Sequence, residues 1–427
     1  MIMNRWQKVI LGSLGTTFSG LMGKTKEDFG SGKKYITYMN VFANYAINSS
    51  EVGLVTISKF EKQNIVQYGD IIFTTSSETL HEVGMTSVVT SDLGEVYLNS
   101  FCFGFRPKDL NIILPEFAVY LFRSREVRKQ ICFNGQGSTR YNLSKNGLLK
   151  NVILSIPTHK EQITIATILS TIDQAIEKTE QLIAKFERIK TGLMQDLLTR
   201  GIDEQGNIRT EETHEFKDSV VGRIPKEWEV DSVKVFLNYI SYGFTNPMPT
   251  TEQGAIMITA ANIFKGKIQY DTCRFTSQKD YDSLLTNKSK PLIGDVLITK
   301  DGSLGRTAIV DKENICINQS VAVLRVKRNL VDNTFFKTLL ESPGYQKKIL
   351  DDSGGSTIKH IYITKLDKMM IAIPSKLKEQ LRILECLNTF NQNVETVLNN
   401  LKKLNSLKIA LMQDLLTGKV RVDSLIN

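Results

Sequence analysis

The chain has 427 residues, of which 41% are hydrophobic and 23% charged, a composition typical of a globular protein with two or three domains. No apolar run approaches the roughly eighteen residues that a membrane span needs, and the N-terminal residues do not resemble a secretory signal, so we expect a cytoplasmic protein without a membrane partner. The net charge is +9, and the excess of lysine and arginine lies mainly in residues 1–155 and 232–373, which favours a polyanion such as nucleic acid as the partner.

Residues 1–155 are predicted to form a first mixed α/β domain. Short β-rich runs alternate there with glycine and serine turns, and they lie at Lys34 to Val41, Gly69 to Thr75 and Glu95 to Phe105. A helical pattern follows from Pro115 to Phe133.

Residues 156–200 are predicted to form one long helix. Apolar residues recur there at alternating steps of four and three, which is the repeat of a coiled coil, and no proline follows Pro157. The resulting seam consists of Ile165, Leu169, Ile172, Ile176, Thr179, Ile183, Phe186, Lys190, Leu193 and Leu197. A helix of this length with one apolar face requires a partner helix in water.

A polar, acidic segment, residues 201–222, is predicted to be an exposed linker. The second globular segment, residues 223–373, repeats the first. Trp6 matches Trp228, and other matches join Ile36 to Phe42 with Ile258 to Phe264, Gly69-Asp70 with Gly294-Asp295, Asn99 and Arg106 with Asn318 and Arg325, and Gly137-Ser138-Thr139 with Gly355-Ser356-Thr357. Two copies of one scaffold with different surfaces indicate similar tasks on two different targets.

Residues 374–427 hold a second long helix and a tail. The run LMQDLLT at 193–199 recurs unchanged at 411–417, and the seam carries over as Ile383, Leu387, Phe390, Val394, Val397, Leu401, Leu404, Lys408, Leu411 and Leu415. The chain's own copy is the obvious partner of each helix, which predicts an antiparallel pair related by an approximate two-fold axis. Lys190 and Lys408 are polar counterparts in the seam, and we expect them to fix its register.

The sequence offers no convincing catalytic or metal-binding pattern. The run Gly20 to Thr25 ends like a phosphate-binding loop but is two residues too short, and Asn246 to Pro249 departs from the Asn-Pro-Pro-aromatic motif of amino-group DNA methyltransferases. The four histidines and five cysteines do not cluster in the sequence. We therefore expect no metal, no disulfide and no cofactor bound by this chain.

Binding residues are predicted at short turns instead. In the second globular segment, Lys300 and Arg306 flank an Asp-Gly turn after a predicted strand, while Gly-Ser-Thr turns precede Arg140 in the first and Lys359 in the second. Such turns let backbone approach phosphates, and the cation can reach a phosphate or a guanine edge. The predicted DNA-binding residues are Thr139, Arg140, Tyr141, Lys300, Arg306, Thr357, Lys359 and His360. The glycines and serines of the turns are better explained as a duplicated structural feature.

Several blocks identify a family in combination. They are the helix starts IPTHKEQ and IPSKLKEQ, the shared LMQDLLT, the segments RTEETHEFKDS and GRIPKEWEV, and the runs GDVLITKDGSLGR and INQSVAVLR. With these blocks the chain resembles, over essentially its full length, the specificity subunit of type I restriction-modification enzymes. The first globular segment departs from the pattern, since Thr75 to Glu78 stand where the second has Lys300 to Ser303.

The resemblance implies an α+β fold with two α/β target recognition domains joined by two long antiparallel coiled-coil helices. It implies that each domain reads one half of a two-part sequence in double-stranded DNA and that the helices set the gap between the halves. The subunit would be non-catalytic. Two modification subunits would methylate adenine with S-adenosylmethionine, and restriction subunits would add an ATP- and Mg²⁺-dependent nuclease.

Three alternatives remain at this point. The chain could be a stand-alone DNA enzyme, a coiled-coil scaffold for proteins, or a decoy specificity protein that binds DNA without recruiting a modification subunit. Turnover by the purified chain would favour the first, and partner binding that is insensitive to salt would favour the second.

Overall fold

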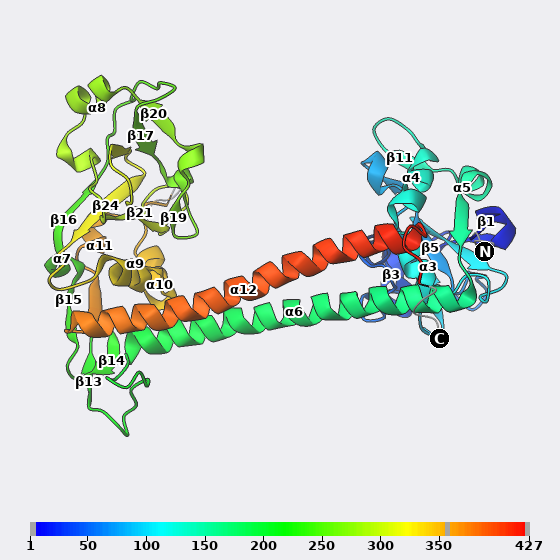
Figure 1. Ribbon diagram of the computed structural model, residues 1–427, viewed down its shortest axis with the longest axis horizontal. Helices are drawn as coiled ribbons and strands as arrows, with labels where there is room; N and C mark the ends of the chain where they lie inside the picture. The colour runs from blue at the N-terminus through cyan, green and yellow to red at the C-terminus, as the bar shows by residue number, and fades with distance from the viewer. Residues whose placement is uncertain (1–5, 355–358, 423–427) are drawn as a thin grey trace. The chain divides into compact units, whose positions relative to one another are not determined.

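The computed structural model describes residues 6–354 and 359–422. Contacts between residues divide the chain into two compact units, which are described one at a time: Met1–Gln181 with Asn399–Asn427, and Leu182–Leu398. Two helices, α6 (His159–Thr199) and α12 (Leu377–Leu416), contribute to both units and are the long ribbons of Figure 1. Each unit also contains one head, which is the described part of residues 6–156 in the first unit and of residues 216–373 in the second.

The first head is built on a four-stranded antiparallel sheet, in the order β2 (Gly15–Ser19), β9 (Cys102–Pro107), β5 (Ile71–Thr74) and β7 (Thr86–Val88). Smaller sheets consist of β4 (Val52–Val55), β3 (Phe29–Ile36) and β8 (Val96–Leu98); of β10 (Gly135–Gln136), β11 (Tyr141–Leu143) and β6 (Ser76–Ser77); and of β1 (Gln7–Ile10) with β12 (Ile153–Ile156). The helices of this head are α1 (Leu11–Leu14), α2 (Tyr38–Ala43), α3 (Pro115–Leu121), α4 (Arg125–Phe133) and α5 (Lys145–Asn151).

The second head repeats the four-stranded sheet, the sheet of β4, β3 and β8, and the pair of β1 with β12 in the same strand order. Its four-stranded sheet consists of β16 (Leu237–Tyr242), β24 (Val321–Val326), β21 (Val296–Thr299) and β22 (Thr307–Ile309). Its other strands are β20 (Arg274–Thr276), β17 (Ala255–Ile258) and β23 (Ile315–Ile317); β15 (Glu229–Ser232) with β25 (Met370–Ile373); β13 (Phe216–Ser219) with β14 (Gly222–Pro225); and β18 (Ile263–Phe264) with β19 (Lys267–Ile268). Its helices are α7 (Val233–Phe236), α8 (Gln278–Leu284), α9 (Asn333–Glu341), α10 (Pro343–Asp351) and α11 (Ile363–Leu366). The predicted mixed fold with an internal repeat is confirmed.

A buried aspartate in each four-stranded sheet explains part of the duplicated sequence. Arg106 Nη2 lies 2.6 Å from Asp70 Oδ2 in the first head, and Arg325 Nη2 lies 2.8 Å from Asp295 Oδ2 in the second. Both aspartates are almost fully buried. Their carboxylates raise the pKa of each arginine above its ordinary value, and the pairing satisfies charges that would be costly to bury alone.

A buried Glu-Gln pair at the start of α6 docks this helix on the first head. Glu161 accepts a hydrogen bond of 3.2 Å from Trp6 Nε1. Gln162 binds main-chain atoms of the head, since its Oε1 accepts from Leu114 N at 2.9 Å and its Nε2 donates to Ile112 O at 2.9 Å. The helix start is thus tied to the head by side chains that recur in the second copy.

The start of α12 makes the same contacts with the second head. Trp228 Nε1 donates to Glu379 Oε1 at 3.2 Å, Gln380 Oε1 accepts from Asp332 N at 2.8 Å, and Gln380 Nε2 donates to Leu330 O at 2.9 Å. The matched tryptophans of the sequence therefore have matched partners.

An arginine that follows each long helix pairs with the glutamate that starts the other one. In the first unit Arg421 Nη2 lies 2.7 Å from Glu161 Oε1, and in the second the guanidinium of Arg209 binds both carboxylate oxygens of Glu379. Burial alone would raise the pKa of Glu161, but hydrogen bonds from Thr158, Trp6 and Arg421 outweigh it and hold this pKa below its ordinary value. Burial also opposes the charge of Arg209, yet the Glu379 carboxylate raises its pKa.

The two long helices pair in antiparallel fashion, as contacts within each unit show. In the first unit Leu411 and Leu415 of α12 join the core that contains Ile165 and Leu169, and in the second unit Leu193 and Leu197 of α6 join the core that contains Ile383 and Leu387. The rings of Phe186 and Phe390 meet edge to face, with centroids 5.7 Å apart. The remaining apolar positions of the seam are half-buried: Ile172, Ile176, Ile183, Val394, Val397, Leu401 and Leu404.

The two seam lysines differ in their surroundings. Lys408 Nζ lies 2.6 Å from Asp173 Oδ1 and 4.3 Å from the centroid of the Tyr45 ring, and 17% of its side chain is exposed. Lys190 is exposed, and no ion pair of its ammonium group occurs among the described residues. The position that corresponds to Asp173 in the second half is Asn391, which explains the difference.

Replacement of Lys408 by methionine should therefore destabilise the chain more than the same change at Lys190. We expect the free energy of unfolding to fall by about 1–2 kcal/mol for Lys408→Met, because Asp173 loses a partner in a site that is only partly open to water. Lys190→Met should stay within about 0.5 kcal/mol of the wild type. Urea unfolding of both variants measures this, and equal effects would contradict the asymmetry.

Two local predictions require correction. The run Lys34 to Val41 is a strand only as far as Ile36, because Thr37 Oγ1 accepts from Asn40 N at 3.2 Å and so starts α2. The predicted helix from Pro115 to Phe133 is two helices, because Ser124 stands between them and caps the second.

The prediction of an exposed linker at residues 201–222 is also wrong in part. Ile202 and Arg209 are buried, and Ile202 pairs with Ile208 in an isolated bridge. The end of the segment already belongs to the β13–β14 hairpin. The ion pair of Arg209 with Glu379 supplies the reason, since it holds an acidic and polar segment against the second unit.

Candidate nucleic-acid interface

The predicted binding residues of the first head lie beside one edge of its four-stranded sheet. Strands β2 and β5 end at this edge and β9 begins there, since Ser19 pairs with Phe103 and Thr74 pairs with Cys102. The turns that follow these strands are consequently neighbours. Thr75 N, for example, donates to Phe101 O at 2.9 Å.

Arg140 is held at this edge by the short strand β6, which follows β5. Its Nε and Nη2 donate to Ser76 Oγ at 3.2 and 3.0 Å, and its guanidinium lies 6.0 Å from the centroid of the Phe101 ring. Thr139 and Arg140 are exposed, whereas Tyr141 is half-buried and pairs with Ser77. A guanidinium has five N–H donors, so two bonds to one hydroxyl leave donors for a phosphate or a guanine.

The corresponding edge of the second head carries a different set of charges. Asp301 lies between two basic residues, with its Oδ2 2.7 Å from Lys300 Nζ and its Oδ1 2.6 Å from His360 Nδ1. The Lys300 ammonium also lies 5.5 Å from the centroid of the Tyr242 ring. The structure therefore brings Lys300 and His360 together, although 59 residues separate His360 from Asp301 in the sequence.

The other predicted residues of the second head do not join this cluster by side-chain contacts. Arg306 Nη1 donates to Ile263 O at 3.3 Å, and its guanidinium lies 5.4 Å from the centroid of the Phe264 ring. Lys359 is exposed, and neither an ion pair nor a side-chain hydrogen bond of Lys359 is found in residues 6–354 and 359–422. Thr357, like Gly355 and Ser356, lies outside the described residues.

A hollow of about 540 Å³ opens next to the Lys300 cluster of the second head. Its wall includes Phe244, Met248, Met257, Thr259, Arg274 and Asn318. The hollow adjoins Lys300 through the turn after β23, since Gln319 N donates to Phe244 O and Lys300 N donates to Ser320 O, both at 2.8 Å. An aromatic and sulfur-rich floor with hydroxyl, amide and guanidinium groups around it suits the edge of a nucleobase.

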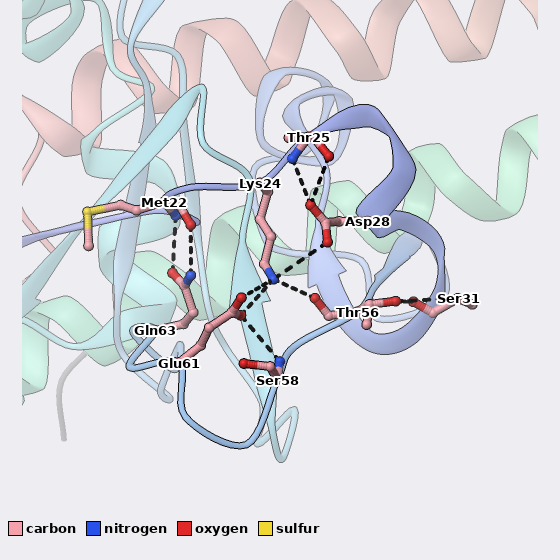
Figure 2. Close-up of polar contacts among 9 residues, drawn as sticks. All are labelled: Met22, Lys24, Thr25, Asp28, Ser31, Thr56, Ser58, Glu61 and Gln63. Carbon is pink, nitrogen blue, oxygen red and sulfur yellow. Dashed lines mark hydrogen bonds and ion pairs between the residues drawn. The ribbon is translucent and has the colours of Figure 1, made fainter.

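The run in the first head that imitates a phosphate-binding loop has a structural role. Lys24 Nζ donates to Glu61 Oε2 at 2.6 Å and to Thr56 O at 2.7 Å, and only 3% of this side chain is exposed (Figure 2). Gly20 is required by close packing, because a Cβ atom there would meet Asn99 O. The lysine of this run is therefore paired with Glu61 of the same head.

The described residues contain no group of three or more histidine, cysteine, aspartate or glutamate side chains that could hold a metal ion. In the same part of the chain no helix is long and apolar enough to cross a membrane. The five cysteines are free thiols, and burial raises the pKa of Cys102 and Cys316 to about 12.

The family model described as "Type I restriction modification DNA specificity domain" matches residues 3–188 and 246–408, which include most of both heads and of both long helices. The chain belongs to this DNA specificity family.

Members of the specificity family from Methanocaldococcus jannaschii are similar along most of the chain. The putative type I restriction enzyme MjaX specificity subunit is 26% identical over 399 residues, covering 91% of this chain and 87% of that protein. The type I restriction enzyme MjaVIII specificity subunit is 26% identical over 317 residues, covering 72% and 71%.

Solved structures support the specificity-family fold. The HsdS subunit from Thermoanaerobacter tengcongensis matches with a TM-score of 0.55 at 17% identity, over 98% of both chains. A chain from a structure of the complex assembly and conformational transition of the type I R-M system matches with a TM-score of 0.66 at 18% identity, over 97% of this chain and 98% of that one.

Sequence reasoning in this specificity-family chain missed the groups that position the cations. Ser76 and Asp301 occupy equivalent positions and each holds a basic side chain of the site. Tyr242 and Phe244 flank Gly243, which corresponds to Gly20. In the alignment of the two halves, Thr75 to Glu78 stand opposite Lys300 to Ser303, and this correspondence could have pointed to Ser76 and Asp301. The aromatic residues carry no comparable pattern.

Proposed function

We propose that this chain is the DNA specificity subunit of a type I restriction-modification system, in which each head reads one half of a two-part target and the two long helices set the spacing. The observation that carries the proposal is the pair of equivalent sheet edges, one bearing Arg140 on Ser76 and the other Lys300 with His360 on Asp301. One scaffold presents different cations and different shapes at the same place, which suits the recognition of two different sequences.

Catalysis belongs to partner subunits in this proposal. Two modification subunits supply S-adenosylmethionine-dependent methylation of adenine, restriction subunits supply ATP- and Mg²⁺-dependent cleavage, and the complex acts in the cytoplasm. The names of the similar proteins, which are specificity subunits of type I restriction enzymes, support this division of labour.

The decisive experiment combines the full chain with a modification subunit of a type I system from the same source. The pair should methylate adenine at one two-part sequence in a random-sequence DNA library, and the chain alone should show no turnover with S-adenosylmethionine, ATP and Mg²⁺. A chain that binds the modification subunit but never DNA would be a protein scaffold. A chain that binds DNA but never the modification subunit would be a decoy.

Arg140→Ala should weaken binding of the chain to the two-part sequence that the pair methylates, because a specific base contact contributes about 1–3 kcal/mol. The same loss should follow in part from Ser76→Ala, which frees the guanidinium from its hydroxyl partner. Arg125→Ala is the matched control, since it removes the same charge from an exposed position of α4 in the same head. Titration of labelled duplex measures all three, and equal losses for Arg125→Ala and Arg140→Ala would remove Arg140 from the site.

A further inference from the structure

Phe60 lies almost entirely in water. Its side chain is 97% exposed, in the loop of residues 56–64 that follows β4 in the first head. An aromatic residue gains nothing for folding at such a position, because the ring removes no apolar surface from water. Either the loop is loosely held and the exposure is incidental, or the ring is displayed for a partner.

The loop is firmly held on both sides of Phe60 (Figure 2). Lys24 Nζ binds Thr56 O before the ring and the Glu61 carboxylate after it. Glu61 N donates to Ser58 O at 3.2 Å, which closes a turn around the ring. At the base of the loop, Ile57 packs against the small core that contains Val55.

Further hydrogen bonds tie the end of the loop to the last residue of β2 and to the segment that follows this strand. The side chain of Gln63 makes two hydrogen bonds with the main chain of Met22, donating to Met22 O at 2.9 Å and accepting from Met22 N at 3.1 Å. Asn64 Nδ2 donates to Ser19 O at 3.0 Å. The ring is therefore presented by an ordered loop, so that little conformational entropy is lost when a partner binds it.

The charge of this loop favours an anionic partner. Lys59 and Lys62 flank the ring and are exposed, and in the described part of the chain no ion pair or hydrogen bond of either ammonium group occurs. Glu61 is the acidic residue of the loop, and its carboxylate is neutralised by Lys24. Two free cations thus surround one exposed ring without a free carboxylate between them.

The end of the loop also touches the predicted DNA-binding edge. Ser19, which it contacts, is the last residue of β2, and the edge at which β2 ends is the one that carries Phe101 and Arg140. The second head has no such loop, because the segment after β20 there forms α8, which Ser277 caps. The two heads consequently differ in shape at corresponding places, as readers of two different sequences should.

We propose that Phe60 is a DNA-contacting residue of the first head, whose ring packs against bases of one half-site while Lys59 and Lys62 bind the phosphates beside it. This inference rests on the proposed function. Exposed aromatic or apolar side chains flanked by cations are a recurrent means of binding duplex DNA, because the side chain can insert between base steps or pack on a thymine methyl group while the cations neutralise the backbone.

The test uses the full chain, alone and with the modification subunit, and the duplex that the wild type selects from a random pool. Phe60→Ala should weaken binding about tenfold or more, and Phe60→Trp should retain it, since an apolar ring of similar size can make the same contact with the duplex. Thermal unfolding should be unchanged because the ring is exposed. Phe133→Ala, which removes an 84% exposed phenylalanine of the same head, should leave the dissociation constant within about twofold.

The contribution of Lys59 and Lys62 is measured separately, by the salt dependence of DNA binding. In the double variant Lys59→Ala, Lys62→Ala, the slope of log binding constant against log salt should fall by about two, whereas Phe60→Ala should leave this slope unchanged. Unaltered DNA affinity of Phe60→Ala would overturn the inference while the proposed function stands. Loss of modification-subunit binding with DNA affinity intact would overturn it in favour of a protein surface. Absence of DNA binding by the wild type in both settings would reject the proposed function itself.

Discussion

Exchange of the first head for that of another specificity-family member with a known target is expected to replace one half of the DNA sequence and to preserve the other half and the spacing. Binding to the original duplex should fall by a factor of about 10³ or more, since specific and non-specific affinities of DNA-binding proteins typically differ by about 10³–10⁷. Sequencing of methylated sites in a library reads the outcome for each half separately.

The structure places the junction for this exchange. Strand β12 pairs with β1 up to Ile156, which faces Gln7, so the exchanged piece must include both strands. Pro157 follows, and Glu161 and Gln162 of α6 must remain with the helix. The donor head should keep a tryptophan equivalent to Trp6, because Glu161 would otherwise lose a donor.

The reciprocal exchange, of residues 223–373, is the matched control. It should alter only the half-site that the first exchange left unchanged. If either exchange altered both halves, or changed the spacing, recognition would not be divided between the heads. If neither exchange altered the methylated sequence, the DNA-reading function would belong to another subunit.

Arg209→Met is expected to lower the free energy of unfolding by about 3–5 kcal/mol, because it leaves a buried carboxylate without its cation. Glu379, which is 3% exposed, would be left in a buried site with Trp228 Nε1 as the remaining side-chain donor shown there. Denaturant unfolding of the full chain, followed by tryptophan fluorescence, measures the effect because Trp228 lies at the site.

Two further variants separate the cause from a general loss of arginine. Arg223→Met removes a 46% exposed arginine that pairs with Glu211 and Asp218, and such exposed pairs contribute within about 1 kcal/mol. The double variant Arg209→Met, Glu379→Met should recover much of the stability, since it removes both buried charges together. A single variant no worse than Arg223→Met would show that the pair contributes little.

The architecture was predictable from the sequence because it is repeated. Apolar steps of four and three depend only on the geometry of a helix pair, and the duplicated LMQDLLT gave each helix its partner. Local capping was harder to see. Thr37 follows a strand and starts a helix within a β-rich run, so that the run Lys34 to Val41 gave no sign of its change in structure.

The candidate site was predictable only in part, for a physical reason. A motif shows which cation stands on a turn but not which distant side chain holds it, and Arg140 is held by Ser76, 64 residues away. The same limit applied to Lys190, whose letter matches Lys408 although its environment lacks a carboxylate such as Asp173. Phe60 between Lys59 and Lys62 was visible in the sequence, but the loop that carries it is held by the distant Lys24.

The glutamines that start α6 and α12 have a consequence for how such proteins acquire new specificities. Gln162 and Gln380 grip their heads by main-chain atoms, at Leu114 N and Ile112 O in one case and at Asp332 N and Leu330 O in the other. Every amino acid supplies the carbonyl and every one except proline supplies the N–H, so a head can diverge or arrive by recombination without loosening the helix that carries it. A lineage built on this frame can change half of its target in one genetic event instead of by a series of weakened intermediates.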